Sequence, residues 1–175
     1  ALAAICKQPL HLTNIRSKRP KPGLQAQHLC AVQAAARVSS AYVEGAELRS
    51  CEINFQAQAI VGGYHEFDIG TAGSCSLVLQ TILPLFLHAR EVAEIRIRGG
   101  THNPWSPGID FLQHAFVPVL RKLGVVIEVT LETPGFYPRG GGCLHVTIDA
   151  RNFAGSLNLS ERGAKTAMYS IATLA

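Results

Sequence analysis

The chain has 175 residues, of which 47% are hydrophobic, and it carries a net charge of +4. This size and apolar content suit one or two domains with a buried core, and they exclude an intrinsically disordered chain. The longest apolar run, residues 77–89, is broken by Gln80, Thr81, Pro84 and His88, so it is too short and too polar to cross a membrane.

The first part of the chain is basic, because residues 1–43 contain no Asp or Glu. Such a segment either favours a polyanionic partner or forms a solvated basic face. Alternating residues predict a strand over residues 11–15, and a loop stiffened by two prolines follows. An amphipathic helix is predicted next, with apolar Leu24, Leu29, Val32 and Ala36.

The middle of the chain predicts strands over residues 47–55 and 63–70 and a helix over residues 74–89. The stretch GTAGSCS, residues 70–76, places small residues before this helix, but it lacks the lysine of a Walker A loop and the GxGxxG spacing. The small residues either leave room for an anion at the helix N-terminus or let the helix pack tightly against a sheet. Gln80 interrupts the apolar helix, and its amide needs a partner in the fold or a ligand.

The second half repeats the plan of the first. A strand over residues 94–97 is followed by a loop that ends in Pro-Gly, as the earlier basic loop does. A predicted helix, with apolar Phe111, Ala115, Val119 and Leu123, and strands over 125–131 and 144–148 complete the copy. This order predicts an α/β or α+β layered fold.

Two loops of the second half contain residues that could either bind a ligand or anchor the chain. Trp105 lies between two prolines, where its ring could stack on a base or fill a loop. Arg139 precedes three glycines in GFYPRGGG, where it could reach an anion or belong to a tight hairpin.

The cysteines and histidines do not predict a metal cage. The five cysteines form no CxxC pair, and the seven histidines form no HxxxH pair. We expect buried free thiols and a reducing, intracellular environment, which is the nucleus in a eukaryote and the cytoplasm in a prokaryote.

Four motifs in order, RSKRPKPGLQAQHL, GTAGSCSLVLQTILP, RGGTHNPWSPGIDF and GFYPRGGG, resemble the RNA 3′-terminal phosphate cyclase family. The resemblance implies repeated β-α-β-α-β-β units like the C-terminal domain of translation initiation factor 3, a fold related to the enolpyruvyl transferases. We expect residues 1–60 to form an incomplete first unit and residues 61–152 a second unit. Residues 153–175 would then begin a small inserted domain and be truncated.

The family resemblance also implies an activity. Members use ATP and a divalent metal, Mg or Mn, to convert an RNA 3′-phosphate into a 2′,3′-cyclic phosphate through a histidine-linked adenylate and an RNA-adenylate. The implied partners are RNA 3′-phosphate ends, ATP and the remaining segments of the same enzyme, with no membrane. The alternative is a non-catalytic, cyclase-like, RNA-binding ribosome-assembly factor of the same fold.

The resemblance assigns roles to five residues of this chain. Gln80 and Pro107 resemble a glutamine and a proline that line the adenylate pocket, and Arg19, Gln27 and Lys21 belong to a basic loop expected to hold RNA or phosphate oxygens. The family's nucleophilic histidine is expected beyond Ala175, and its glycine-rich motif before Ala1. We therefore expect a cyclase fragment without a catalytic residue, inactive alone, whose metal ligands are unknown.

Overall fold

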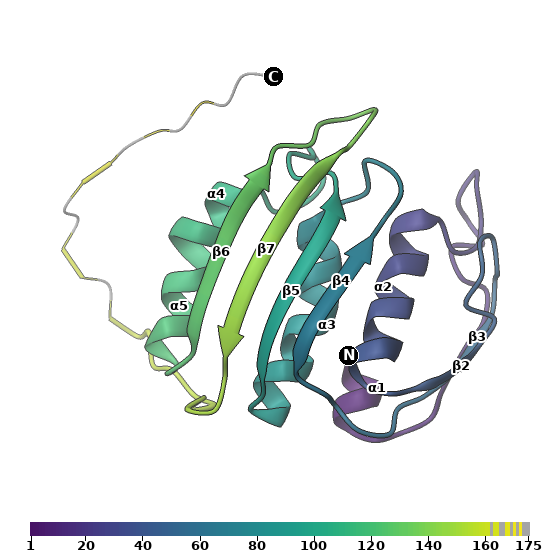
Figure 1. Ribbon diagram of the computed structural model, residues 1–175, viewed down its shortest axis with the longest axis horizontal. Coiled ribbons are helices and arrows are strands. Elements are labelled where there is room, and N and C mark those ends of the chain that lie inside the picture. Colours follow the sequence, from purple (N-terminus) through teal and green to yellow (C-terminus); the bar gives the residue numbers. More distant parts are fainter. Residues whose placement is uncertain (162, 165–166, 169, 171, 173–175) are drawn as a thin grey trace.

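The computed structural model describes residues 1–161, 163–164, 167–168, 170 and 172. These residues form two β-sheets with helices packed between and against them, so the fold is mixed α/β, as predicted. Figure 1 shows the larger sheet in the middle of the molecule and the smaller sheet beyond helix α2.

The larger sheet has four strands in the order β4-β5-β7-β6. Strands β4 and β5 are parallel, and the other neighbouring pairs are antiparallel. Their bounds are Gly63–Asp68 for β4, Val92–Gly99 for β5, Val126–Thr133 for β6 and Gly142–Asp149 for β7. Every second side chain of β5 is buried, because one sheet face packs on the helices while the other faces water.

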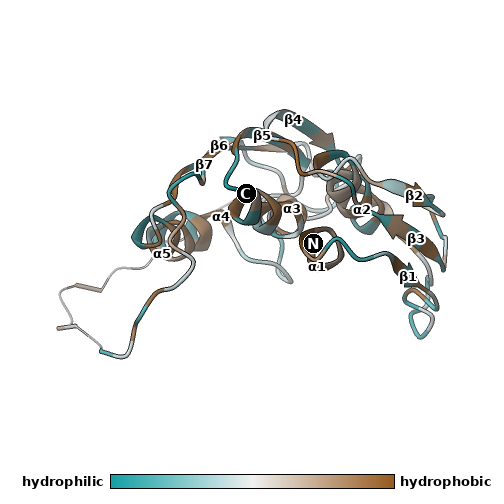
Figure 2. Cartoon of the chain, turned by 90° about the horizontal axis from the view of Figure 1, so that it is seen from below, coloured by the Kyte–Doolittle hydropathy of each residue, from teal (hydrophilic) through white to brown (hydrophobic). Residues whose placement is uncertain are grey.

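Helices cover one face of this sheet, as the view from below in Figure 2 shows. Helix α3 (Cys75–Ala89) connects the parallel strands β4 and β5, and it is the most deeply buried helix of the described part of the chain. The large side chains Leu79, Ile82, Leu85 and Phe86 on α3 are at most 2% exposed. Their burial gives the helix its place in the core.

The last helical segment contains a π-helical turn. It runs through α4 (Ile109–Phe111), the π-helix η1 (Leu112–Phe116) and α5 (Val117–Lys122). Our prediction of its apolar face was right only for Leu123, which packs on the core. Phe111, Ala115 and Val119 are exposed, and the buried residues are Ile109, Leu112, Val117 and Leu120. The predicted face was placed one residue away from the buried row Leu112, Phe116 and Leu120, because the neighbouring row is also apolar.

The smaller sheet is antiparallel and has the order β1-β3-β2. Its elements are α1 (Leu2–Ile5), β1 (Leu10–Leu12), α2 (Ala26–Val38), β2 (Tyr42–Glu44) and β3 (Ile53–Gln56). Helix α2 is covered on two sides. Leu29 and Val32 pack on a small cluster that includes Ile15 and Ile53, while Cys30 and Val38 belong to the main core.

Two further expectations need correction. The strand predicted over residues 47–55 begins only at Ile53, because residues 47–52 form a turn that packs on the basic loop. The Arg49 amide donates to the Leu24 carbonyl, and the Leu24 amide donates to the Ser50 carbonyl. The strand predicted over 11–15 ends at Leu12.

Part of the segment predicted as the start of an inserted domain, 153–175, lies outside the described residues. Its described residues contain no helix or strand. They therefore do not test the predicted domain boundaries, which stay predictions. Within the described part of the chain, no helix is long and apolar enough to cross a membrane.

Candidate functional site

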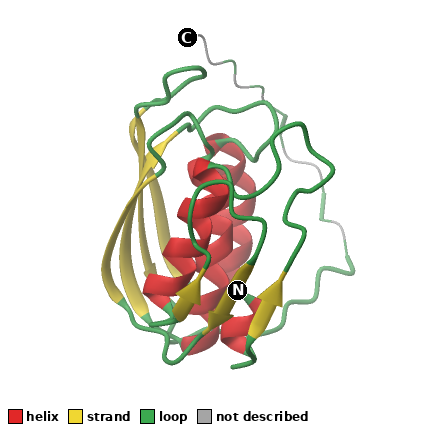
Figure 3. Ribbon diagram, turned by 90° about the vertical axis from the view of Figure 1, so that its right-hand side faces the viewer, coloured by secondary structure: helices red, strands yellow, loops and turns green. Residues whose placement is uncertain are grey.

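Four loops meet at one end of the molecule, which we call the loop end. They are residues 13–25 before α2, 69–74 before α3, 100–108 before α4, and 134–141 between β6 and β7. Figures 1 and 3 show these loops gathered beyond the ends of β4 and β5, where α2 and α3 begin. The carboxyl ends of parallel strands are the usual place for a ligand site in α/β sheets.

Backbone contacts hold these loops together. The Gly100 amide donates to the Gly73 carbonyl at 2.7 Å, and the Cys75 amide donates to the Gly100 carbonyl at 2.9 Å. The Asn103 side chain donates to the Ala72 carbonyl at 3.1 Å. The loop before α3 is therefore fixed directly against the loop after β5.

Gly73 of GTAGSCS and Gly100 of the facing loop are needed for this close packing. A Cβ atom on Gly100 would lie 2.3 Å from the Ala72 carbonyl oxygen, and one on Gly73 would lie 2.7 Å from the Ile69 side chain. Both distances are shorter than real Cβ contacts allow, so larger residues would push the loops apart. Of the two alternatives raised by the sequence, these contacts support tight packing. Ser74 caps α3 by accepting from the Leu77 amide at 3.3 Å.

Gln80 and Pro107 line the same cavity, of about 170 Å³, which we call the α3 cavity. The Ser76 hydroxyl donates to the Pro107 carbonyl at 2.8 Å, which fixes this proline against α3. The other lining residues are apolar: Leu79, Leu83, Pro84, Leu87, Phe111, Leu112 and Phe116.

The α3 cavity contains polar groups that are available to a ligand. Gln80 is exposed rather than buried, and the structure gives its side chain no hydrogen bond to another described residue. Pro84 lies four residues after Gln80 and has no N–H, so it cannot donate the usual helical hydrogen bond to the Gln80 carbonyl. An amide and a carbonyl oxygen of one residue are thus available beside an apolar wall.

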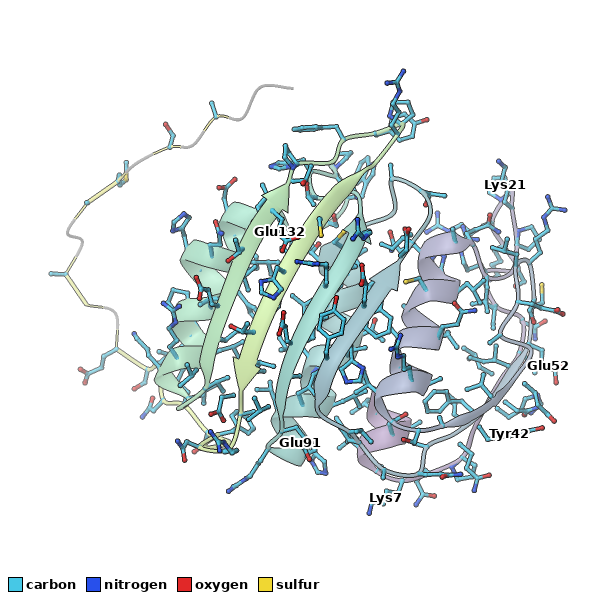
Figure 4. All side chains as sticks on the ribbon, viewed as in Figure 1. Lys7, Lys21, Tyr42, Glu52, Glu91 and Glu132 are labelled. Carbon is cyan, nitrogen blue, oxygen red and sulfur yellow. The ribbon has the colours of Figure 1, made fainter. Side chains whose placement is uncertain are left out.

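The basic loop is braced from within by Arg16. Its guanidinium donates to the Lys21 carbonyl at 2.7 Å and to the Gly23 carbonyl at 2.9 Å. Arg19 and Lys21 are exposed, and neither takes part in an ion pair with a described residue. Figure 4 shows the Lys21 side chain extending outward at the loop end. The two cations are therefore available to a phosphate.

Gln27 joins the basic segment to the loop before α3. Its side-chain oxygen accepts from the Ser74 amide at 2.7 Å. Gln27 and Ser74 also line a larger cavity of about 490 Å³, which we call the loop cavity. The remaining lining residues are Ala72, Leu77, Asn103, Pro104, Trp105, Ser106 and Tyr137.

The structure brings only some of the five predicted residues together. Gln80 and Pro107 share the α3 cavity, Gln27 lies in the loop cavity, and Arg19 and Lys21 line neither cavity. Asn103, Tyr137 and Arg16 were not among the predicted site residues. In the sequence, the only indication that Arg16 braces the loop is its position just before the segment with two prolines.

Two of the histidines make contacts that give them structural roles. His65 is buried beside Phe67 and Phe86, with its Nε2 atom bonded to the Val61 carbonyl at 3.1 Å. His102 stacks on Phe136, with ring centroids 4.8 Å apart, and anchors two loops. No histidine lines the loop cavity or the α3 cavity.

The described residues do not fit a metal ion. They contain no group of three or more His, Cys, Asp or Glu side chains that could hold one. The predicted Mg or Mn therefore has no ligand set in the described part of this chain, and we derive no step through it.

Three of the cysteines are buried free thiols, as predicted. Burial raises the pKa of Cys30 to about 11 and the pKa of Cys75 to about 12. Burial and the neighbouring Glu132 carboxylate raise the pKa of Cys143 to about 11. All three are protonated at neutral pH, so they are poor nucleophiles. Cys6 and Cys51 are exposed, which corrects the prediction for these two.

Comparison with known proteins agrees with the motifs. A family model described as RNA 3′-terminal phosphate cyclase matches residues 1–160. A protein of that name from Ectopseudomonas mendocina is 50% identical over 148 residues, which cover 85% of this chain and 43% of the relative. One from Pseudomonas fluorescens is 48% identical over 164 residues, covering 94% of this chain and 48% of the relative.

A third relative of the same name, from Ralstonia nicotianae, is 47% identical over 164 residues, which cover 93% of this chain and 47% of the relative. The chain spans about half the length of these curated relatives. The match to the family model over most of the chain, together with this level of identity, shows that the chain belongs to the RNA 3′-terminal phosphate cyclase family.

Proposed function

We propose that this chain is the nucleotide- and RNA-binding part of an RNA 3′-terminal phosphate cyclase. That enzyme converts an RNA 3′-phosphate into a 2′,3′-cyclic phosphate with ATP. The observation that carries the proposal is the sharing of one cavity by Gln80 and Pro107, two residues 27 positions apart that the resemblance assigned to the adenylate pocket. The names of the relatives support the same activity.

The α3 cavity suits a flat base. Its apolar walls can cover the faces of an adenine ring, with Pro107 against one of them. The exocyclic amine of adenine is a donor, and the Gln80 carbonyl lacks its helical donor because of Pro84. The Gln80 side-chain amide can both donate and accept. At about 170 Å³ the cavity would hold the base, while the ribose and phosphates would lie outside it.

The basic loop suits the RNA phosphates. Arg19 and Lys21 are exposed cations at the loop end, and the Arg16 brace fixes the backbone that carries them. A fixed loop loses less conformational entropy when its side chains bind a phosphate. Gln27 lies between this loop and the start of α3, where it can donate to a phosphate or sugar oxygen.

In the proposed reaction ATP supplies an AMP group that activates the terminal phosphate, and the neighbouring RNA 2′-hydroxyl then displaces AMP and closes the ring. This chain would hold adenine and the RNA end in fixed relative positions, which lowers the entropy cost of both steps. We propose none of the seven histidines as nucleophile, because none lines either cavity. The family's catalytic histidine would come from another part of the enzyme, so this chain alone would be inactive.

We also propose that the two sheets are copies of one unit. The elements from β4 to β7 follow the order β-α-β-α-β-β, and the strand order β1-β3-β2 matches β5-β7-β6. This supports an incomplete unit over residues 1–60 and a second over residues 61–152. The relatives named above are bacterial, which favours the cytoplasm over the nucleus as the place of action.

The direct test uses a full-length protein that contains this chain, ATP, and a short RNA with a labelled 3′-phosphate. The expected product keeps its label after phosphatase treatment, and AMP and pyrophosphate are released. A matched RNA with a 3′-hydroxyl should give no product. Tight RNA binding without any ATP-dependent conversion would contradict the enzyme proposal and support the cyclase-like RNA-binding alternative.

A further inference from the structure

Two aromatic side chains of the loop cavity are almost entirely in water. Trp105 is 92% exposed and Tyr137 is 81% exposed, and both line the loop cavity. They come from different loops, one before α4 and one between β6 and β7. Large rings left in water gain free energy when a flat apolar surface covers them.

The loop cavity also offers hydrogen-bond donors and acceptors, including the side-chain amides of Gln27 and Asn103. The Gln27 oxygen is occupied by the Ser74 amide, so its NH₂ group remains as a donor. The Asn103 NH₂ group is bonded to the Ala72 carbonyl, so its oxygen remains as an acceptor. The edge of a nucleobase presents both kinds of group, and a phosphate presents only acceptors.

Among the described residues, no charged side chain lines the loop cavity. Exposed cations are found instead in the loops that border it: Arg139 lies two residues after Tyr137, and Arg19 and Lys21 belong to the loop that leads into α2, the helix of Gln27. A neutral, aromatic cavity beside a basic surface is suited to a base whose backbone phosphates contact the cations.

The backbone that carries both aromatic residues is firmly held. The Gly135 carbonyl accepts from the Thr101 amide at 2.9 Å, and the Thr101 hydroxyl accepts from the Gly135 amide at 2.9 Å. His102 stacks on Phe136, the residue before Tyr137. The two rings are therefore mounted on loops whose separation is fixed before any ligand binds.

We infer that the loop cavity binds a nucleobase of single-stranded RNA, held by Trp105 and Tyr137. This inference rests on the proposed function and deepens it, because the α3 cavity would hold the adenine of ATP while the loop cavity would hold a base of the RNA substrate. The backbone phosphates on either side of that base contact the cations of the basic loop.

Trp105 reports on this site directly, because it is the only tryptophan in the sequence. The chain is titrated with a short oligouridylate that carries a 3′-phosphate, and its tryptophan fluorescence is followed. The strand contains uridine because the α3 cavity is proposed to bind adenine, so that cavity should not be the preferred site for this RNA. We expect saturable quenching, and about tenfold weaker binding by the Tyr137→Ala variant, in the range measured for loss of one stacked base.

The decisive comparison is an abasic strand with the same ribose phosphates and no bases. It should bind about tenfold more weakly, cause little quenching, and respond little to Tyr137→Ala. Tyr42→Ala is the matched control, because Tyr42 is an exposed aromatic residue on β2 that does not line the loop cavity. It should leave the binding of both strands unchanged.

The inference is overturned if oligouridylate binds without quenching, if Tyr137→Ala weakens both strands equally, or if neither strand binds. These outcomes are separate from the test of the proposed function. Base-dependent quenching in a full-length protein that does not cyclise RNA would support the base site and refute the cyclase proposal. Cyclisation of RNA without quenching would support the cyclase proposal and refute the base site.

Discussion

Replacing two cations of the basic loop should reduce the salt dependence of RNA binding. The double variant Arg19→Gln/Lys21→Gln removes two exposed charges that have no ion-pair partner among the described residues. No side-chain hydrogen bond of the loop is lost, because those among the described residues are donated by Asn14, Arg16 and Gln25 and not by Arg19 or Lys21. We therefore expect an unchanged melting temperature and a change in RNA affinity alone.

The size of the effect follows from counterion release. Each phosphate contact on a single strand adds about 0.7 to the slope of log K against log salt concentration. Loss of two contacts lowers the slope by about 1.4. Between 50 and 200 mM salt, the unmodified protein should then lose roughly sevenfold more affinity than the variant loses.

The assay is fluorescence anisotropy of a labelled single-stranded RNA at several salt concentrations. Lys7→Gln is the matched control, because Figure 4 shows Lys7 and Lys21 at opposite ends of the molecule and both are exposed. Equal slopes for the double variant and the unmodified protein would refute the reasoning and leave the basic loop as a solvated face.

Three further predictions concern the fold. Gly100→Ala should lower the free energy of unfolding by roughly 1–3 kcal/mol, because its Cβ would lie 2.3 Å from the Ala72 carbonyl oxygen. The control Gly108→Ala, whose Cβ would have nothing within 4 Å, should cost less than about 0.5 kcal/mol. Equal melting temperatures of these two variants would contradict the prediction. Hydrogen bonds from the Arg151 side chain and backbone amide lower the pKa of Asp149 to about 2. The stabilisation from the ionised Asp149 carboxylate should therefore be present above pH 4 and lost as the pH falls through about 2. In thermal melts, Asp149→Asn should lower the melting temperature at pH 7 and hardly change it at pH 2. Cys6 and Cys51 should react with a thiol reagent in the folded protein, while the other three cysteines should react only after unfolding; fast reaction of Cys75 would show that its burial is wrong.

The main elements of the larger sheet could be predicted from the sequence because their patterns are regular. The apolar run after Ser74 forms a helix over Cys75–Ala89, and the alternating residues of GYHEFD form β4. The apolar face of the last helix was placed one residue away from the buried row, because Phe111, Ala115 and Val119 are apolar although they are exposed. Periodicity alone does not decide which of two adjacent apolar rows of a helix faces the core.

The site could be predicted only in part. The family motifs pointed to Gln80 and Pro107, and the fold places both in one cavity. The bond between Gln27 and the Ser74 amide joins residues 47 positions apart, and no local pattern encodes it. The cavity shared by Trp105 and Tyr137 depends in the same way on how two separate loops pack.

The central claim is that the α3 cavity holds the adenine of ATP. It is tested most directly by the ATP dependence of AMP transfer to a full-length protein that contains this chain. Gln80→Ala should raise the ATP concentration for half-maximal labelling about tenfold, as expected for loss of one or two hydrogen bonds. Gln8→Ala, an exposed glutamine outside the cavity, should leave it unchanged. Identical labelling by the Gln80→Ala variant and the unmodified protein would contradict the assignment of this cavity to the nucleotide.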